Sequence, residues 1–161
     1  SALEATLSQA DDDLTAVIFV DLDHFKRVND RHGHAFGDEL LMVAAGRLTG
    51  AVRQGDFVGR LGGDEFLVVC PTVSGPQEAS RVADRVAEAL HGDVTISGTA
   101  VELRASVGMV CAQRQGASAE ELVSRADVAM YAAKRGRERQ RPGSVTAEDA
   151  AVLGAMRSTR D

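Results

Sequence analysis

The sequence predicts an α+β domain in which helices cover a largely antiparallel β-sheet. Three observations predict this fold class: short apolar runs typical of strands, longer segments with helical periodicity, and a mixed order of the two. The 161 residues suit one ordinary domain, and an apolar content of 44% is enough to bury a core. The expected order is strand, helix, hairpin, helix, strands, helix.

The first half of the chain begins with a strand and ends with a hairpin. Residues 15–22 (TAVIFVDL) are β-rich and end in acid, and a helix is expected over residues 24–30. A second helix is expected over residues 37–53, where one face carries Leu41, Ala44, Leu48 and Val52. Residues 57–61 and 66–70 are strand candidates joined by a glycine-rich turn, which predicts a β-hairpin.

The second half alternates helix, strands and helix. Residues 74–77 suit a helix cap, and the apolar positions that follow at helical spacing are Ala79, Val82, Val86 and Leu90. Strands are expected over residues 94–96 and 101–111, with a turn at Ser97 and Gly98. Residues 118–121 form a capping-box pattern that opens a last helix with Leu122, Ala126, Met130 and Ala133 on one face.

The two ends of the chain predict less regular structure. Residues 1–14 are interpreted as a truncated N-terminal helix or linker, and residues 15–141 as the domain itself. Pro142 and Gly143 interrupt the pattern, so residues 142–161 are interpreted as a C-terminal linker or short helix, the helix over 146–157. Residues 1–10 lack the basic start and apolar stretch of a secretory signal.

Composition restricts the partners and the compartment. A formal net charge of -6 argues against a nucleic-acid-coating protein, although bound cations still allow a nucleotide substrate. No apolar run is long enough to cross a bilayer, so no membrane contact is expected from this domain, whose parent protein is still free to be membrane-anchored. Cys70 and Cys111 each follow an apolar run and are expected to be free thiols, which fits a cytoplasmic location.

Two groups of carboxylates are candidates for metal chemistry. Asp21 and Asp23 end the first strand and are expected on one face of it, but they also suit capping of the following helix. Asp64 and Glu65 lie at the hairpin tip after two glycines; a lone acidic pair there is usually a solvated turn. If the hairpin lies beside the first strand, the acids converge and offer Mg²⁺ its preferred ligands.

Four segments, in order, resemble the GGDEF family. Residues 60–66 (RLGGDEF) are similar to its namesake motif, and residues 20–30 (VDLDHFKRVND) to its first strand and helix. Residues 32–38 (HGHAFGD) resemble its nucleotide-binding turn, and residues 126–134 (ADVAMYAAK) its last helix. The resemblance spans roughly residues 15–139. It implies a five-stranded sheet with flanking helices, similar to nucleotide cyclase and polymerase palm domains.

The implied activity is that of a diguanylate cyclase, which joins two GTP molecules into cyclic di-GMP and releases pyrophosphate. The resemblance implies two Mg²⁺ or Mn²⁺ ions bound by Asp21, Asp64 and the Leu22 carbonyl. Glu65 matches an acid that either binds metal or activates the ribose 3′-hydroxyl, and Asp64 and Glu65 together are the expected catalytic acids. Gly62 and Gly63 match the substrate-approaching glycines. Each subunit of the family holds one GTP, so a homodimer is expected.

Other residues match positions that bind the nucleotide. Asn29 and Asp38 match the residues that read guanine, and an Asp can accept from guanine N–H groups in a way adenine does not satisfy. By themselves they suit helix caps around a turn at residues 32–37. Lys26 and Lys134 match phosphate-contacting lysines. A zinc site at His32 and His34 is disfavoured because no further ligand completes it locally.

A second site is indicated at Arg53 and Asp56, which resemble the family's product-inhibition motif for cyclic di-GMP. The Arg53 guanidinium suits a bidentate contact with phosphate or stacking on guanine. The alternative interpretation is that Arg53 and Asp56 form a surface ion pair at a helix end. Arg81 or Arg85 of a neighbouring subunit is a weaker candidate to complete this site.

Two departures from the family pattern bear on activity. The usual D-x-L-T-G-L-x-N-R segment is missing before residue 15, so impaired activity in isolation is expected. The family's phosphate-contacting arginine falls four positions after the lysine, where this chain has Glu138, while Arg137 comes one residue early. Either the helix ends sooner and Arg137 adjusts, or Arg139 substitutes, or triphosphate binding is weakened.

Three functional hypotheses remain open at this point. An active cyclase is favoured by the intact Asp21, Asp64 and Glu65. The alternatives are a catalytically silent module that binds GTP or cyclic di-GMP, and a metal-dependent nucleotidyl transferase with another product.

Overall fold

A computed structural model describes residues 1–9 and 13–139, and the expected short helix over 146–157 lies outside these residues. A central sheet is formed by β1 (Leu14–Leu22), β2 (Phe57–Gly62), β3 (Glu65–Val73) and β6 (Ala105–Gln113). Its order is β2-β3-β1-β6 and each neighbouring pair is antiparallel. β1 is therefore an inner strand, and its residues 15–20 are all buried, in keeping with the β-rich apolar run.

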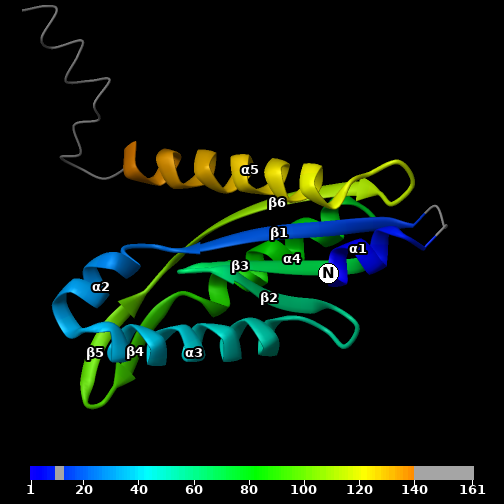
Figure 1. The fold of residues 1–161 in the computed structure, drawn as a ribbon. Coiled ribbons are helices and arrows are strands. Elements are labelled where there is room, and N and C mark those ends of the chain that lie inside the picture. Colours follow the sequence, from blue (N-terminus) through cyan, green and yellow to red (C-terminus); the bar gives the residue numbers. More distant parts are fainter. Residues whose placement is uncertain (10–12, 140–161) are drawn as a thin grey trace, which may run out of the picture.

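Helices cover both faces of this sheet (Figure 1). One face packs against α1 (Ala2–Leu7) and α5 (Ala119–Arg139) in a core that includes Val17, Phe19 and Met130. The other face packs against α2 (Phe25–His32), α3 (His34–Ala51) and α4 (Pro76–Ala89) in a larger core. The predicted α+β class, an antiparallel sheet flanked by helices, is confirmed.

The strand count of the sheet differs from the expected five. In the part of the chain that the structure describes, the central sheet has four strands, while β4 (Gly92–Ile96) and β5 (Thr99–Leu103) pair only with each other. The expected strand over 101–111 is divided at Arg104, whose carbonyl accepts a 2.8 Å hydrogen bond from the Asp23 backbone N–H. That bond continues the β1–β6 register by one residue pair, and the separate β4–β5 hairpin buries Val94, Ile96 and Leu103 on the α3 side.

Helix starts also differ from expectation in two places. The turn expected over residues 32–37 consists of little more than Gly33 at φ 91°, so α3 already begins at His34. Asp38 therefore lies inside α3, and the capping role considered for Asn29 and Asp38 is wrong. The helix after Ser74 has Gly75 as its N-cap without a side-chain cap; instead the Glu78 carboxylate accepts from the Ser74 backbone N–H at 2.6 Å.

Other local expectations are confirmed. Ser118 Oγ accepts from the Glu121 N–H at 3.1 Å, as a cap of α5 should. Ser97 and Gly98 turn the β4–β5 hairpin with φ values of 49° and 79°. Cys70 is buried, Cys111 is half-buried and both thiols are free. Among the described helices, none combines the length and apolarity that a membrane crossing requires.

Candidate active site

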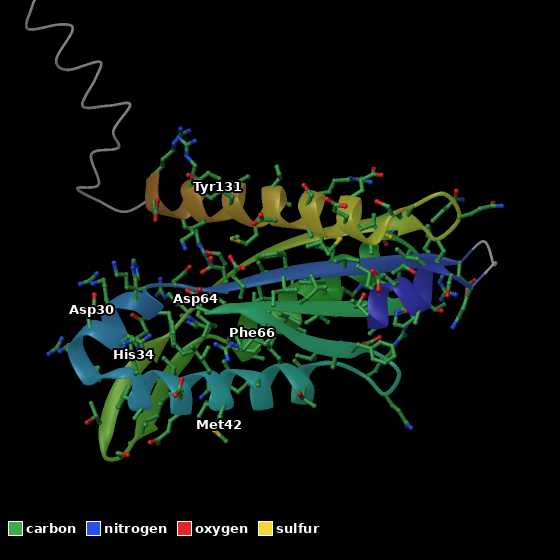
Figure 2. The ribbon with its side chains drawn as sticks, viewed as in Figure 1. Asp30, His34, Met42, Asp64, Phe66 and Tyr131 are labelled. Carbon is green, nitrogen blue, oxygen red and sulfur yellow. The ribbon has the colours of Figure 1, made fainter. Side chains whose placement is uncertain are left out.

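The hairpin tip lies against the end of β1, so carboxylates distant in sequence come together. Asp21 is in register with Glu65 on β3, and the Leu22 backbone N–H donates to the Asp64 carbonyl at 3.1 Å. Gly63 has a φ of 51°, a left-handed conformation that favours glycine at this tight turn. Figure 2 shows Asp64 at the end of the sheet that lies near α2 and away from α1.

Asp21 is a carboxylate whose ionisation is opposed by its surroundings. Burial raises the pKa of Asp21, and the neighbouring Asp64 charge raises it further, while Lys134 acts in the opposite direction. The Lys134 Nζ lies 3.5 Å from Asp21 Oδ1, and the Asp21 side chain is only 16% exposed. Two acids held this close need more positive charge than one lysine supplies, which is the environment that binds a cation.

Side chains by themselves do not complete a metal centre here. Among residues 1–9 and 13–139, no three His, Cys, Asp or Glu side chains are arranged to hold an ion. A cation between Asp21 and Asp64 therefore needs further oxygens, for which the Leu22 carbonyl and substrate phosphates are candidates. Two carboxylates with phosphate and water are a usual environment for Mg²⁺, so these residues fit the ion. His32, considered for zinc, stacks on Phe36 with ring centroids 4.5 Å apart.

Asp23 lies close enough to Asp21 for its charge to raise the pKa of Asp21, but its carboxylate is also bound by other residues. It accepts hydrogen bonds from the buried Ser106 Oγ at 2.6 Å and from Arg137 Nη2 at 3.2 Å. Arg137 also donates to the Ala105 carbonyl at 2.8 Å and to Ser106 Oγ. The alternative prediction that an aspartate caps α2 is wrong, because the N-cap is His24 and no side chain of the described residues caps that helix.

Arg137 lies within α5, which continues for two residues after it. The first explanation offered for its shifted position, an earlier end of the helix, is wrong because α5 runs to Arg139. The side chain bends toward the start of β6 and ties the end of α5 to Asp23. Ser106 and its role in this contact were missed from the sequence; a serine inside a buried apolar strand was the available signal.

The predicted nucleotide-reading residues lie on the α2–α3 pair. The side-chain oxygen of Asn29 is buried and has no hydrogen-bond partner within the described chain. Asp38 is exposed at the edge of a cavity of about 480 Å³ that is also lined by Leu41, Met42, Arg60 and Phe66. Lys26 is exposed on α2. A buried acceptor without a donor is what an incoming ligand N–H would satisfy.

The second predicted site lies between α3 and β2. The Arg53 backbone N–H donates to Asp56 Oδ2 at 3.2 Å, and its guanidinium bonds Glu78 Oε1 at 3.0 Å and the Thr72 carbonyl. The Asp56 side chain is 1% exposed; its Oδ1 has no hydrogen-bond partner in the described chain but lies 3.5 Å from Arg53 Nε, so the two side chains form an ion pair just after α3. Arg85 donates to the Ala51 carbonyl of the same chain.

A family model described as diguanylate cyclase, GGDEF domain, matches residues 1–140. The chain belongs to the GGDEF family. Diguanylate cyclase TpbB of Pseudomonas aeruginosa is 39% identical over 121 residues, which are 74% of this chain and 28% of TpbB. The chain thus spans less than a third of the length of this relative.

Solved GGDEF structures agree with the fold. A sensory box/GGDEF family protein from Caulobacter crescentus is 40% identical, with a TM-score of 0.77 over 84% of this chain and 88% of that one. The coiled coil and GGDEF domain of DgcB from the same organism, solved with c-di-GMP, is 27% identical. Its TM-score is 0.72 over 83% of this chain and 72% of that one.

Proposed function

We propose that this GGDEF domain is a diguanylate cyclase that condenses two GTP molecules into cyclic di-GMP across a homodimer. One observation carries the proposal: Asp21, Asp64 and Lys134 meet at the same end of the sheet as the Asn29 oxygen, which has no hydrogen-bond partner among the described residues. A cation-seeking acid pair beside a base-reading amide suits a nucleoside triphosphate. The net charge does not favour nucleic acid as an alternative partner.

The reaction forms a phosphodiester bond and releases pyrophosphate. The 3′-hydroxyl of one GTP attacks the α-phosphorus of the other, the bond from that phosphorus to the bridging oxygen breaks, and the hydroxyl proton is lost. A second, equivalent attack closes the ring, so two pyrophosphates leave. Two divalent ions, Mg²⁺ or Mn²⁺, when bound would activate the attacking oxygen and stabilise the leaving one.

The chain's own residues have separate tasks in this proposal. Asp21, Asp64, Glu65 and the Leu22 carbonyl hold the ions, and the Gly62–Gly63 turn lets the backbone approach the phosphates. Lys26 and Lys134 balance triphosphate charge. Because Arg137 is tied to Asp23 and Ser106, it contributes to the triphosphate only if it leaves them.

Guanine recognition is assigned to α2 and α3. Asn29 offers a buried acceptor without a donor, and Asp38 offers an exposed carboxylate at the cavity edge. Guanine presents N1–H and an exocyclic amine to such acceptors, whereas adenine presents a different pattern and leaves an acceptor unsatisfied.

Cyclic di-GMP is also proposed as an inhibitor that binds at Arg53 and Asp56. The Arg53–Asp56 ion pair supports this assignment, because it places a half-exposed guanidinium beside a carboxylate oxygen that makes no hydrogen bond in the described chain. The c-di-GMP complex of DgcB shows that a relative binds this nucleotide. Free thiols at Cys70 and Cys111 fit a cytoplasmic location.

The decisive test incubates the domain with GTP and Mg²⁺ and detects cyclic di-GMP by chromatography. A fused dimer, and a version fused to a dimeric coiled coil at its N-terminus, extend the test to conditions that favour pairing of two domains. Product formation supports the proposal. GTP binding without product in all three forms identifies a silent regulatory module, and a different nucleotide product identifies another transferase.

A further inference from the structure

Gly37 occupies a contact between two helices where no side chain fits. α2 and α3 are joined by Gly33 alone, and Figure 2 shows this corner between the labelled Asp30 and His34. Phe25 and Asn29 lie one turn apart on α2, both against Gly37. A Cβ atom built on Gly37 would lie 1.7 Å from Asn29 Oδ1 and 3.1 Å from Phe25 Cζ.

The backbone conformation does not explain why residue 37 is glycine. Gly37 lies within the regular helix α3 and is not in the left-handed region, so alanine suits its backbone better. Gly46 lies on the same helix, and a Cβ atom added there would have no neighbouring atom within 4 Å. The close approach of Asn29 is the feature of residue 37 that requires glycine.

This approach fixes where Asn29 offers its amide. The Asn29 oxygen is buried without a hydrogen-bond partner in the described chain, and Asp38 follows Gly37 directly and faces solvent at the cavity edge. The position of one acceptor relative to the other therefore depends on how closely α2 packs against α3 at Gly37.

We propose that Gly37 is a specificity-determining position, because its lack of a side chain sets the position of the Asn29 amide oxygen relative to the Asp38 carboxylate. The inference rests on the proposed function, in which these two residues read guanine. Carbon–oxygen contacts under 3.0 Å are essentially never seen, so an alanine must displace the Asn29 amide by roughly 1 Å. A misplacement of that size is enough to disrupt binding geometry.

The test compares Gly37→Ala with Gly46→Ala as a matched control on the same helix. Equilibrium binding is measured with a fluorescent, slowly reacting GTP analogue, in competition with ITP, which lacks the exocyclic amine, and with ATP. Gly37→Ala is expected to weaken GTP binding about tenfold or more and to reduce the preference for GTP over ITP. Gly46→Ala is expected to bind within about twofold of the parent chain.

A second comparison separates the Asn29 contact from general damage to the fold. In an Asn29→Ala background the steric conflict is gone, so Gly37→Ala is expected to add little further loss of binding. In the free protein, the Asn29 side-chain amide resonances should shift in Gly37→Ala and not in Gly46→Ala. This NMR readout needs no nucleotide.

The outcomes distinguish this inference from the proposed function. Unchanged Asn29 resonances or an unchanged GTP-over-ITP preference in Gly37→Ala overturns the role of Gly37 alone. An equal loss of binding with and without the Asn29 side chain also overturns it. Failure of the parent chain to bind GTP overturns the proposed function, and with it the assignment to guanine, whereas the NMR comparison still tests the contact.

Discussion

At the scale of single residues, the clearest feature is the raised pKa of Asp21, caused first by burial and then by repulsion from the Asp64 charge. We predict that Asp64→Asn lowers cyclase turnover by ~10²-fold or more, because a lost cation ligand removes several kcal/mol of transition-state stabilisation. The same change removes a like charge beside Asp21, so the urea midpoint should be unchanged or higher. Turnover and urea unfolding are measured on the same preparation.

Asp84→Asn is the control for this substitution, since Asp84 is exposed on α4, away from the hairpin. It should leave both measurements unchanged. Full activity of Asp64→Asn would remove the central site assignment. A large fall in its urea midpoint would show that Asp64 stabilises the fold, contrary to the repulsion argument.

Cys70 is a residue whose chemistry is suppressed by its surroundings. Burial, followed by the nearby Asp56 carboxylate, raises the pKa of the Cys70 thiol to about 12. The thiolate is the reactive form, so the folded protein should not be alkylated at Cys70 at pH 8. Iodoacetamide labelling followed by peptide mass spectrometry tests this, with urea-unfolded protein as the positive control.

The same shift has a consequence for stability at high pH. A raised thiol pKa favours the protonated, folded form, so its contribution is complete below the unfolded value of 9.0 and is lost as pH rises toward about 12. Unfolding free energy should therefore decline through this window. Replacing Cys70 by alanine should reduce the steepness of that decline, and an identical slope in both proteins would contradict this origin.

At the scale of elements, Gly108 determines how closely α5 packs on the sheet. A Cβ atom there would lie 2.0 Å from the Met130 backbone nitrogen and 2.3 Å from the Ala126 carbonyl oxygen. Backbone atoms of a helix cannot yield locally, so Gly108→Ala should push α5 outward and cost about 1–3 kcal/mol of unfolding free energy. Lys134, one turn beyond Met130, should then move away from Asp21.

Urea unfolding measures the loss for Gly108→Ala, and Gly136→Ala is the matched control. Gly136 lies on α5, and within residues 1–9 and 13–139 an added Cβ would meet no neighbouring atom within 4 Å, so alanine there should stabilise the helix by up to ~1 kcal/mol. If both substitutions have the same effect, close packing of α5 on β6 is not what requires glycine at residue 108.

Element types were largely predictable because their apolar periodicity reports local burial. The buried run of β1, the hairpin and the apolar stripes of α4 and α5 appear where the sequence predicts them. The break at Arg104 was not predictable, because no glycine or proline marks it within residues 101–105. Likewise, Arg137 reaches Asp23 across 114 positions of sequence, and no local pattern reports such a contact.

At the scale of the whole molecule, the two ends of the sheet are built differently. Near the start of β1, the buried Arg114 bonds Thr15 Oγ1 at 3.2 Å, Thr72 Oγ1 at 2.8 Å and the Pro71 carbonyl. It also donates to Gln9 after α1 at 3.2 Å, so α1, β1 and β3 are joined at one point. The opposite end holds the mutually repelling acids Asp21 and Asp64 and the Asn29 oxygen, which has no hydrogen-bond partner in the described chain. Both features destabilise the fold, and binding sites commonly contain such features.

This division predicts separate effects on stability and activity. Arg114→Lys keeps a charge but loses the planar fork, so it should cost about 2–4 kcal/mol of unfolding free energy by leaving buried acceptors unpaired. Cyclase turnover, measured well below the unfolding temperature, should stay within about twofold because Arg114 bonds Thr15 and Pro71 at the opposite end of the sheet from the acids. Arg125→Lys, on the exposed face of α5, is the control for stability. A loss of turnover in Arg114→Lys without a loss of stability would contradict the division.

Regulation by product should depend on a competition for Arg53. In the free domain its guanidinium bonds Glu78 at 3.0 Å and the Thr72 carbonyl, so binding of cyclic di-GMP must displace at least part of this arrangement. Arg53→Ala is expected to relieve product inhibition.

Glu78→Gln removes the competing charge and should lower the cyclic di-GMP concentration needed for half-inhibition by about two- to fivefold, as expected for an exposed ion pair. Initial rates at increasing cyclic di-GMP measure both variants, with Glu88→Gln on the same helix as the control. If the half-inhibiting concentration of cyclic di-GMP rises in Arg53→Ala and falls in Glu78→Gln, the Glu78 contact competes with the product for Arg53. If Glu78→Gln and the parent chain have the same half-inhibiting concentration, there is no such competition.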